Sequence, residues 1–181
     1  DLCHTLKKAE NHAWLGDPME LALVRMAENS GRMWQEPQRF DEVPFDADRK
    51  RMSILNRSHH GAVLYTKGAL LTVLPLCTHL STAQGVLPLS PEACEGLKDA
   101  ELELARQGLR VLALATRGVA EGERREHLEQ GLTLLGLVGL EDPPRPEVAP
   151  AIQTCREAGI KVIIVTVDHP HTALANAREI G

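Results

Sequence analysis

The stretch D-P-P-R-P-E-V-A-P-A-I-Q-T-C-R-E-A-G-I-K-V-I-I-V-T-V-D-H-P-H-T-A, residues 142–173, decides how the C-terminal part of the chain is expected to fold. Residues 162–165 form a continuous run of β-branched side chains, which is typical of a strand covered on both faces of a parallel sheet. The preceding residues 151–158 have a helical pattern, and Gly159 is placed to end that helix in a left-handed conformation. The pattern therefore predicts a helix followed by a buried strand.

A second helix is predicted after this strand, over residues 172–180, because Pro170 suits the first turn of a helix. Thr166 and Asp168 then lie at the carboxyl end of a strand, where an open α/β sheet forms its crevice and helix amides meet phosphate oxygens. Asp168 is anionic, so it would face a metal, a lysine or a ribose hydroxyl sooner than a phosphate. An N-cap role for Asp168 before Pro170 explains the same residues equally well.

Prolines mark the start of this stretch. The pair at residues 143–144 cannot donate backbone hydrogen bonds and must lie outside a sheet interior, so it gives the clearest domain boundary. We therefore predict one domain over residues 1–141 and part of a second domain over residues 142–181. Pro150 lies one turn inside the expected helix, and it either delays the helix start to about residue 148 or kinks the first turn.

Upstream, residues 4–140 mix short strands with helices and lack the regular βαβ alternation of a parallel sheet. The predicted fold class is therefore an antiparallel α+β domain with flanking helices, followed by an α/β fragment. A first helix is marked by Asp17 as N-cap, Pro18 at the first position and Gly31 as the stop, and a second is predicted over residues 90–107. Strands are predicted over residues 52–55, 62–66, 111–115 and 132–140.

Composition narrows the function classes. The chain has 181 residues and a formal net charge of -5, so it lacks the basic excess of a nucleic-acid binder. No stretch approaches the roughly 20 apolar residues of a membrane span. The four cysteines are widely spaced and form no C-x-x-C pair, which argues against zinc and against a disulfide framework. The chain starts without methionine and stops when a parallel sheet has only begun, so we expect a fragment of a longer protein.

Four upstream segments carry side chains that also have ordinary structural interpretations. Glu20 stands three residues after Asp17, where it fits the N3 partner of a capping box. Phe45 precedes a charged run, and burial in the core is the favoured interpretation of its pattern alone. Lys67 ends an apolar strand before a glycine, where a lysine is usually solvated, and Arg110 is a charge at a strand start.

In the same order along the chain, these segments and the C-terminal stretch resemble motifs of the P-type ATPases that pump cations. The resemblance covers most of the chain, so coincidence is a poor explanation. It implies a nucleotide-binding domain followed by part of a haloacid-dehalogenase-like phosphorylation domain. The matching segments are G-D-P-M-E (16–20), F-D-A-D-R-K-R-M-S (45–53), K-G-A (67–69), G-L-R-V-L-A-L-A (108–115), D-P-P-R (142–145), A-G-I-K-V-I (158–163) and T-V-D-H-P (166–170).

The resemblance implies a site for the adenine of ATP in the upstream motifs. Phe45 would stack on the base, and such stacking contributes roughly 1 to 3 kcal/mol per base. Glu20 would accept a hydrogen bond from the adenine amino group. Lys67 would lie deep in the adenine pocket, where Gly68 lets the backbone turn beside it.

Three further residues are assigned roles by the same resemblance. Lys50 and Met52 would flank the base, and the ammonium group of Lys50 would meet the phosphates. Arg110 would contact the nucleotide phosphates, for which a guanidinium is suited because it is permanently charged and makes paired hydrogen bonds. Some members carry an arginine that reaches toward the phosphates where this chain has Ala47, so one phosphate contact is expected to be missing.

At the phosphate end, the loop Thr166-Val167-Asp168 would approach the γ-phosphate. The family has glycine where this chain has Val167. A β-branched side chain does not easily adopt positive φ, and it keeps a phosphate away from the backbone. We therefore expect the adenine end of the site to be complete and the phosphate end to be altered.

In the family, ATP phosphorylates an aspartate in a D-K-T-G-T-L-T motif, a T-G-D-G-x-N-D loop holds Mg²⁺, and hydrolysis is coupled to cation movement. Neither motif occurs in this chain, and no metal ligand is predicted within it. The resemblance therefore implies a soluble ATP-binding portion of a pump at the cytoplasmic face of a membrane. It would work with the remaining domains of the pump and a cation bound elsewhere, and it is not expected to be catalytically competent alone.

Two alternatives remain open. One is a non-catalytic nucleotide-binding or regulatory module from a degenerate relative, in which Val167 reflects lost turnover. The other is a soluble haloacid-dehalogenase-like phosphatase, against which the large N-terminal nucleotide domain argues. The pump interpretation predicts D-K-T-G-T-L-T just upstream of the chain and apolar stretches of about 20 residues beyond both of its ends.

Overall fold

The computed structural model describes residues 3–8, 14–31, 38–58, 61–120, 122–141, 145–165, 174, 177–178 and 180. The chain forms two compact units. The first comprises Asp1–Pro91 and Leu112–Val138, and the second comprises Glu92–Val111 and Gly139–Gly181. The division into residues 1–141 and 142–181 stays a prediction.

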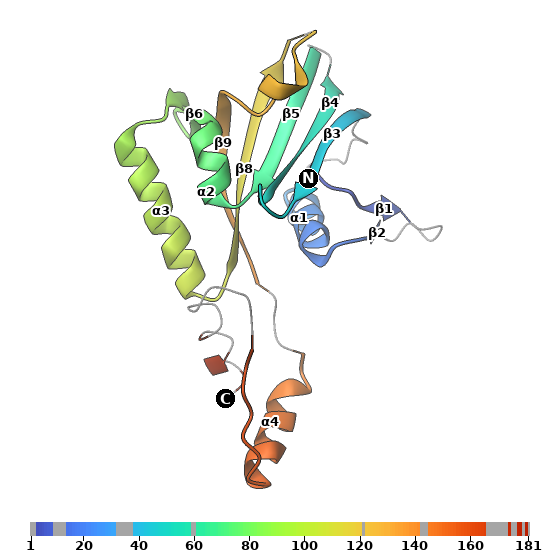
Figure 1. Ribbon diagram of the computed structural model, residues 1–181, viewed down its shortest axis with the longest axis vertical. Helices are drawn as coiled ribbons and strands as arrows, with labels where there is room; N and C mark the ends of the chain where they lie inside the picture. The colour runs from blue at the N-terminus through green and yellow to red at the C-terminus, as the bar shows by residue number, and fades with distance from the viewer. Residues whose placement is uncertain are drawn as a thin grey trace. The chain divides into compact units, whose positions relative to one another are not determined.

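A seven-stranded sheet is the main feature of this mixed α/β fold (Figure 1). In spatial order the sheet contains β3 (Gln38–Asp46), β4 (Arg51–Ser58), β5 (Gly61–Gly68), β8 (Arg110–Val119), β9 (Leu132–Leu140), β6 (Cys77–Thr82) and β7 (Gly85–Pro88). The pairs β3–β4, β4–β5, β5–β8 and β6–β7 are antiparallel, whereas β6 runs parallel to β9. The strands β1 (Lys7–Lys8) and β2 (Trp14–Leu15) pair with each other in a separate two-stranded sheet.

The register of β4 and β5 determines which side chains share a face. Met52 pairs with Lys67, and Arg57 pairs with Ala62, without a register shift between them. Because successive side chains of a strand point to opposite faces, Met52 and Lys67 lie on one face and Arg57 and Ala62 on the other. The middle of the sheet is covered on both faces, and its fully buried side chains include Ser53, Ile54, Leu64, Thr66, Leu132 and Leu134.

Helix α1 (Pro18–Asn29) begins as the sequence predicts. Asp17 Oδ1 accepts hydrogen bonds from the amides of Met19 at 2.8 Å and Glu20 at 3.3 Å. The C-cap is Ser30, and Gly31 follows with φ of 72°, a left-handed conformation that favours glycine. Apolar residues of the helix are in the core, where Leu23 and Val24 are buried.

The other helices divide into short and long elements. Helix α2 (Leu70–Val73) continues directly into the 3₁₀ turn η1 (Leu74–Leu76), and a second 3₁₀ turn, η2 (Arg125–His127), lies between β8 and β9. Helix α3 (Pro91–Arg106) confirms the helix predicted over residues 90–107.

The four predicted strands are confirmed as β4, β5, β8 and β9, and all but β9 extend beyond the predicted range. The sequence prediction missed the strands β1, β2, β3, β6 and β7 and the short helix α2. Strand β3 has the sequence Q-R-F-D-E-V-P-F-D and an edge position in the sheet, with register shifts between Arg39 and Asp41 and between Val43 and Asp46. An edge strand exposes one side to solvent, so it need not carry the apolar alternation that identifies an inner strand.

Helix α4 (Val148–Glu157) settles the alternatives for Pro150. The helix begins at Val148, so Pro150 is its third residue. The first backbone N–H groups of a helix have no acceptor within it, so the missing N–H of a proline costs no hydrogen bond at this position. At the other end Gly159 has φ of 72°, as predicted for a left-handed helix stop.

The prediction of a strand over residues 162–165 is wrong. These residues have no regular secondary structure, and Ile163 and Val165 are 71% and 91% exposed. A strand of a parallel sheet needs neighbouring strands on its edges, and among the described residues none pairs with this segment. The predicted loop Thr166–Asp168 and most of the helix predicted over residues 172–180 lie outside the described residues.

Candidate functional site

A cavity of about 300 Å³ in the first unit collects residues from the start of α1 and from four neighbouring strands. It lies on the face of the sheet that carries Met52 and Lys67. Six residues expected to contact the adenine end of a nucleotide line it together: Glu20, Phe45, Lys50, Met52, Lys67 and Gly68. The sequence prediction missed the other lining residues, which are Thr5, Asp17, Met19, Pro44 and Leu112.

Glu20 and Lys67 form a buried ion pair in the cavity wall. Lys67 Nζ donates to Glu20 Oε1 at 2.6 Å, and the two side chains are 9% and 8% exposed. The interpretation of Lys67 as a solvated strand end is therefore wrong. It fails because α1 covers the end of β5 and supplies a carboxylate, so the lysine can be buried without leaving its charge uncompensated.

Thr5 also binds the Glu20 carboxylate. The Thr5 amide and hydroxyl both donate to Oε2 at 2.9 Å. The carboxylate is thus bound by Thr5 and Lys67, and not by the amide of Asp17 that a capping box requires. Burial would raise the pKa of Glu20, but the hydrogen bonds from Lys67 and Thr5 outweigh it and lower the pKa below its usual value.

Phe45 is 64% exposed, so the interpretation of this residue as core is wrong. The reason lies in the pairing of β3 with β4, which is irregular between Val43 and Asp46. A bulge re-aims the side chains next to it, and here Pro44 and Phe45 line the cavity instead of packing under the sheet. An exposed aromatic ring beside a cavity offers a face on which a planar ligand can stack.

The turn after Phe45 presents Lys50 to the cavity. Asp46 Oδ1 accepts hydrogen bonds from the amides of Asp48 at 3.0 Å and Arg49 at 2.9 Å, and the Asp46 carbonyl accepts from the Lys50 amide at 2.7 Å. Lys50 has φ of 49°, which places a non-glycine residue in the left-handed region. Its side chain is exposed, so its charge is available to an anionic group at the mouth of the cavity.

Gly68 is required by close backbone packing. A Cβ atom at this position would lie 2.5 Å from the Lys50 carbonyl oxygen and 2.5 Å from Arg51 Cβ. The turn and the end of β5 are also joined by a hydrogen bond from the Ala69 amide to the Lys50 carbonyl at 3.0 Å. The glycine therefore allows Lys50 and Lys67 to border the same cavity.

Of the described residues expected to meet the phosphates, Lys50 lines this cavity and Arg110 is not among its lining residues. Arg110 is the exposed first residue of β8 and belongs to the second unit, whereas every residue that lines the cavity belongs to the first. Thr166, Val167 and Asp168 lie outside the described residues. The cavity therefore contains the six residues expected around adenine, of which Lys50 is also expected to meet the phosphates.

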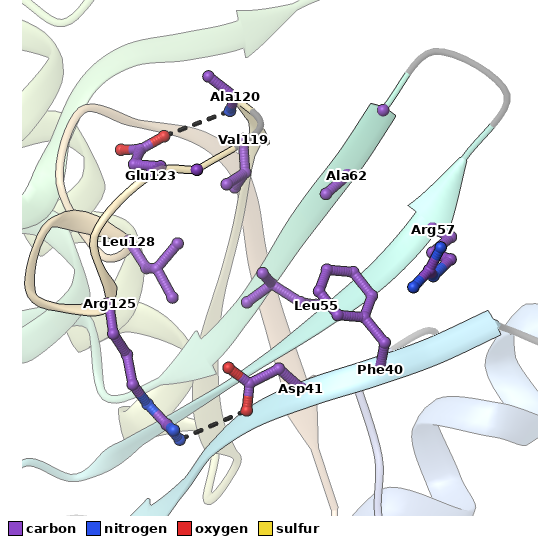
Figure 2. Close-up of a pocket in the computed structure, with 12 residues that line it drawn as sticks. Phe40, Asp41, Leu55, Arg57, Ala62, Val119, Ala120, Glu123, Arg125 and Leu128 are labelled. Atoms are coloured by element: carbon purple, nitrogen blue, oxygen red, sulfur yellow. Dashed lines mark hydrogen bonds and ion pairs between the residues drawn. The ribbon is translucent and has the colours of Figure 1, made fainter.

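Figure 2 shows a second cavity, of about 500 Å³. Arg57 and Ala62 line it, so it lies on the face of the sheet opposite to Met52 and Lys67. Its charged side chains are largely engaged within the protein. Arg125 lies 3.5 Å from the Asp41 carboxylate, Glu123 binds Arg117, and the guanidinium of Arg57 lies 5.3 Å from the centroid of the Phe40 ring. The smaller cavity is the better candidate because a buried carboxylate, a buried ammonium and an exposed aromatic ring converge on it.

The described parts of the chain contain no group of three or more His, Cys, Asp and Glu side chains that could hold a metal ion. No helix within them is long and apolar enough to cross a membrane.

Comparisons with known proteins agree with one another. Residues 2–147 match the family model described as P-type ATPase, cytoplasmic domain N. The chain is 36% identical to calcium-transporting ATPase 1 of Bacillus cereus over 94% of this chain and 20% of that protein. It is 37% identical to a sodium/potassium exporting P-type ATPase of Schizosaccharomyces pombe over 99% of this chain and 18% of that protein. The chain thus spans about a fifth of the length of these curated relatives.

Proposed function

The chain belongs to the P-type ATPase family through its match to cytoplasmic domain N, and we propose from this premise that it binds ATP in the cavity lined by Glu20, Phe45 and Lys67. One observation carries the proposal: an exposed aromatic ring and a buried carboxylate–ammonium pair border one cavity, although their positions in the sequence are far apart.

The base is the part of ATP that these residues suit best. The Phe45 ring stacks on the face of adenine, a contact that contributes roughly 1 to 3 kcal/mol. A carboxylate has about four acceptor positions, and Lys67 and Thr5 use three of them at Glu20. One position remains for the adenine amino group. Met52, which is buried beside Lys67, supplies apolar contact to the ring edge.

The phosphates extend from the base toward the exposed ammonium group of Lys50. Arg110 is the second cation that we assign to the phosphates, because a guanidinium makes paired hydrogen bonds to phosphate oxygens. Thr166, Val167 and Asp168 belong to the loop that receives the γ-phosphate in the complete protein, and Val167 weakens that contact because its side chain blocks close approach to the backbone.

For the complete protein we propose ATP-driven cation transport with a phospho-aspartate intermediate and Mg²⁺ bound by residues outside this chain. The relatives are named as calcium-transporting, cation-transporting and sodium/potassium exporting ATPases, which supports transport of a cation. Residues 1–141 then act as the nucleotide-binding domain and residues 142–181 as part of the haloacid-dehalogenase-like phosphorylation domain, both at the cytoplasmic face of a membrane. The alternative is a non-catalytic nucleotide-binding module, which the altered residue Val167 favours.

Titration of ATP into this chain tests the proposal. The chain has two phenylalanines, both on β3, which provide a matched pair of variants. Phe45→Ala removes the ring that lines the candidate cavity, whereas Phe40→Ala removes a ring that lines the cavity on the opposite face. We expect the Kd for ATP to rise about tenfold or more in Phe45→Ala and to change less than about twofold in Phe40→Ala. Equal affinities of all three proteins would overturn the assignment of the site.

A further inference from the structure

Glu129 does not line the candidate cavity, but its carboxylate accepts hydrogen bonds from three side chains of the segment 49–53. Arg49 Nη2 donates to its two carboxylate oxygens at 2.5 and 2.6 Å, Arg51 Nε donates at 3.1 Å, and Ser53 Oγ donates at 2.7 Å. The Glu129 side chain is 14% exposed. A partly buried carboxylate with this many donors holds its partners more firmly than a surface ion pair does.

Glu129, Arg49, Arg51 and Ser53 form a hydrogen-bonded group, the Glu129 cluster, which contacts β4 on the face opposite to the cavity. Arg51 and Ser53 stand on either side of Met52 in β4, and Met52 lines the cavity. Because neighbouring side chains of a strand point to opposite faces, Glu129 binds the face of β4 that is turned away from the cavity. Ser53 Oγ also lies 2.8 Å from Thr66 Oγ1 on β5, so the hydrogen-bonded cluster extends to the next strand.

The cluster also holds the residues on both sides of Lys50, which has a left-handed backbone conformation. Arg49 and Arg51 are the immediate neighbours of Lys50, and both are bound to Glu129. A left-handed conformation costs a non-glycine residue roughly 1 to 2 kcal/mol, so the surrounding contacts must maintain it. The ties on both sides of Lys50 are well placed to do so.

We propose that Glu129 is a positioning residue for nucleotide binding: it holds Arg49 and Arg51 and thereby fixes the Asp46–Arg51 turn that presents Lys50 and Phe45 to the ligand. This inference rests on the proposed binding of ATP in the cavity. A turn that is ordered before the ligand arrives loses less conformational entropy on binding, so Glu129 raises affinity without touching the nucleotide.

Charge alone predicts the opposite effect. Removal of Glu129 leaves two uncompensated guanidinium groups beside Lys50, and added positive charge strengthens the binding of phosphates. Such an effect would raise the affinity for ATP and leave adenosine, which has no phosphates, unchanged. Loss of positioning weakens the binding of both ligands, because Phe45 contacts the base. Adenosine therefore distinguishes the two effects.

The test compares Glu129→Gln and Glu129→Ala with Glu123→Gln in the same chain. Glu123 is on the same β8–β9 loop and binds Arg117, so its variant loses the same charge and an ion pair without touching the turn. We expect the Kd for ATP and for adenosine to rise about three- to tenfold in the Glu129 variants and less than about twofold in Glu123→Gln. Amide hydrogen exchange at Lys50 and Ala69, whose amides donate across the turn, should accelerate in the Glu129 variants alone.

Unchanged Kd values in the Glu129 variants would overturn the inference, and so would an equal loss in Glu123→Gln. If the Glu129 variants bind ATP more tightly and adenosine equally well, Glu129 acts through its charge and the positioning role is wrong. If the wild-type chain binds neither ATP nor adenosine, the proposed function fails and the inference fails with it. Hydrogen exchange then reports separately whether Glu129 holds the turn.

Discussion

Lys67 on β5 and Glu20 on α1 form an ion pair of 2.6 Å inside the wall of the candidate cavity, with both side chains less than a tenth exposed. Desolvation of two charges offsets much of the attraction between them, so such a pair need not stabilise the fold. It does hold the lysine and the carboxylate in one geometry. The pair therefore matters most for what the cavity can bind and for what happens when one partner is removed.

Replacement of Lys67 by methionine should destabilise the chain. Glu20 would remain buried without its cation, and breaking a buried pair in this way costs about 3 to 5 kcal/mol. Lys98→Met is the matched control, since Lys98 pairs with Glu95 on the surface of α3 with 55% and 71% of the side chains exposed, and such a pair contributes about 0 to 1 kcal/mol. Unfolding in urea measures the free energy of unfolding of both variants. Similar losses of unfolding free energy in the two would show that burial does not make the Lys67–Glu20 pair more sensitive than a surface pair.

Acid should weaken the fold through Glu20. Burial would raise the pKa of this carboxyl, but hydrogen bonds from Lys67 and Thr5 lower it, so its folded-state pKa lies below the ordinary glutamate value of about 4.3. The stabilisation is therefore complete above about pH 4.3 and is lost as the pH falls through the folded-state pKa.

The free energy of unfolding, measured from about pH 6 down to about pH 3, checks this prediction. The wild-type value should fall more steeply below about pH 4.3 than the value for Glu20→Gln, which has no carboxyl to protonate. Parallel curves for the two proteins would show that Glu20 does not carry the acid sensitivity.

Local signals in the sequence predicted the helices α1, α3 and α4 and the strands β4, β5, β8 and β9. Asp17 before Pro18 marks the start of α1, and Gly31 and Gly159 mark helix ends, because caps depend on residues that are neighbours in the chain. The segment 162–165 has the composition of a buried strand but no described neighbour, so it shows that a strand is a property of the sheet around it.

The candidate site was predictable only in part. The motifs identified six residues of the cavity. The pairing of Lys67 with Glu20 joins residues 47 positions apart, and no periodicity reveals such a contact. Thr5 and Glu129 carry no motif of their own. Their roles become visible only where the fold brings them to Glu20 and to the Asp46–Arg51 turn.

Alanine at Gly68 should disturb both stability and binding. The added Cβ would lie 2.5 Å from a backbone oxygen of Lys50, so the turn or the end of β5 must shift. We expect a loss of about 1 to 3 kcal/mol in unfolding free energy and weaker ATP binding. Gly118→Ala on β8 is the control, because a Cβ there meets no atom within 4 Å. Equal stability of the two variants would contradict the close packing of the turn against β5.

The acceptor character of Glu20 should favour ATP over GTP. An ionised carboxylate accepts from the amino group of adenine but only repels the carbonyl oxygen that guanine carries at the same ring position. An unsatisfied buried acceptor costs about 1 to 3 kcal/mol, so the Kd for GTP should be about tenfold higher or more. Glu20→Gln adds a hydrogen-bond donor, so it should lower the ratio of the Kd for GTP to the Kd for ATP. Competition binding with both nucleotides measures it, and a ratio near one in the wild type would exclude this contact.

Glycine at Lys50 should separate the conformation of the turn from the charge that it presents. Lys50 has φ of 49°, which glycine adopts without the roughly 1 to 2 kcal/mol cost of other residues, so Lys50→Gly should keep the unfolding free energy within about 1 kcal/mol of wild type. The loss of the ammonium group should raise the Kd for ATP about tenfold and affect adenosine much less, because adenosine carries no phosphate. Lys50→Ile removes the same charge but cannot easily adopt positive φ, so it should also lower stability by at least about 1 kcal/mol. If Lys50→Gly weakens adenosine and ATP binding equally, the contribution of Lys50 is to the shape of the cavity and not to the phosphates.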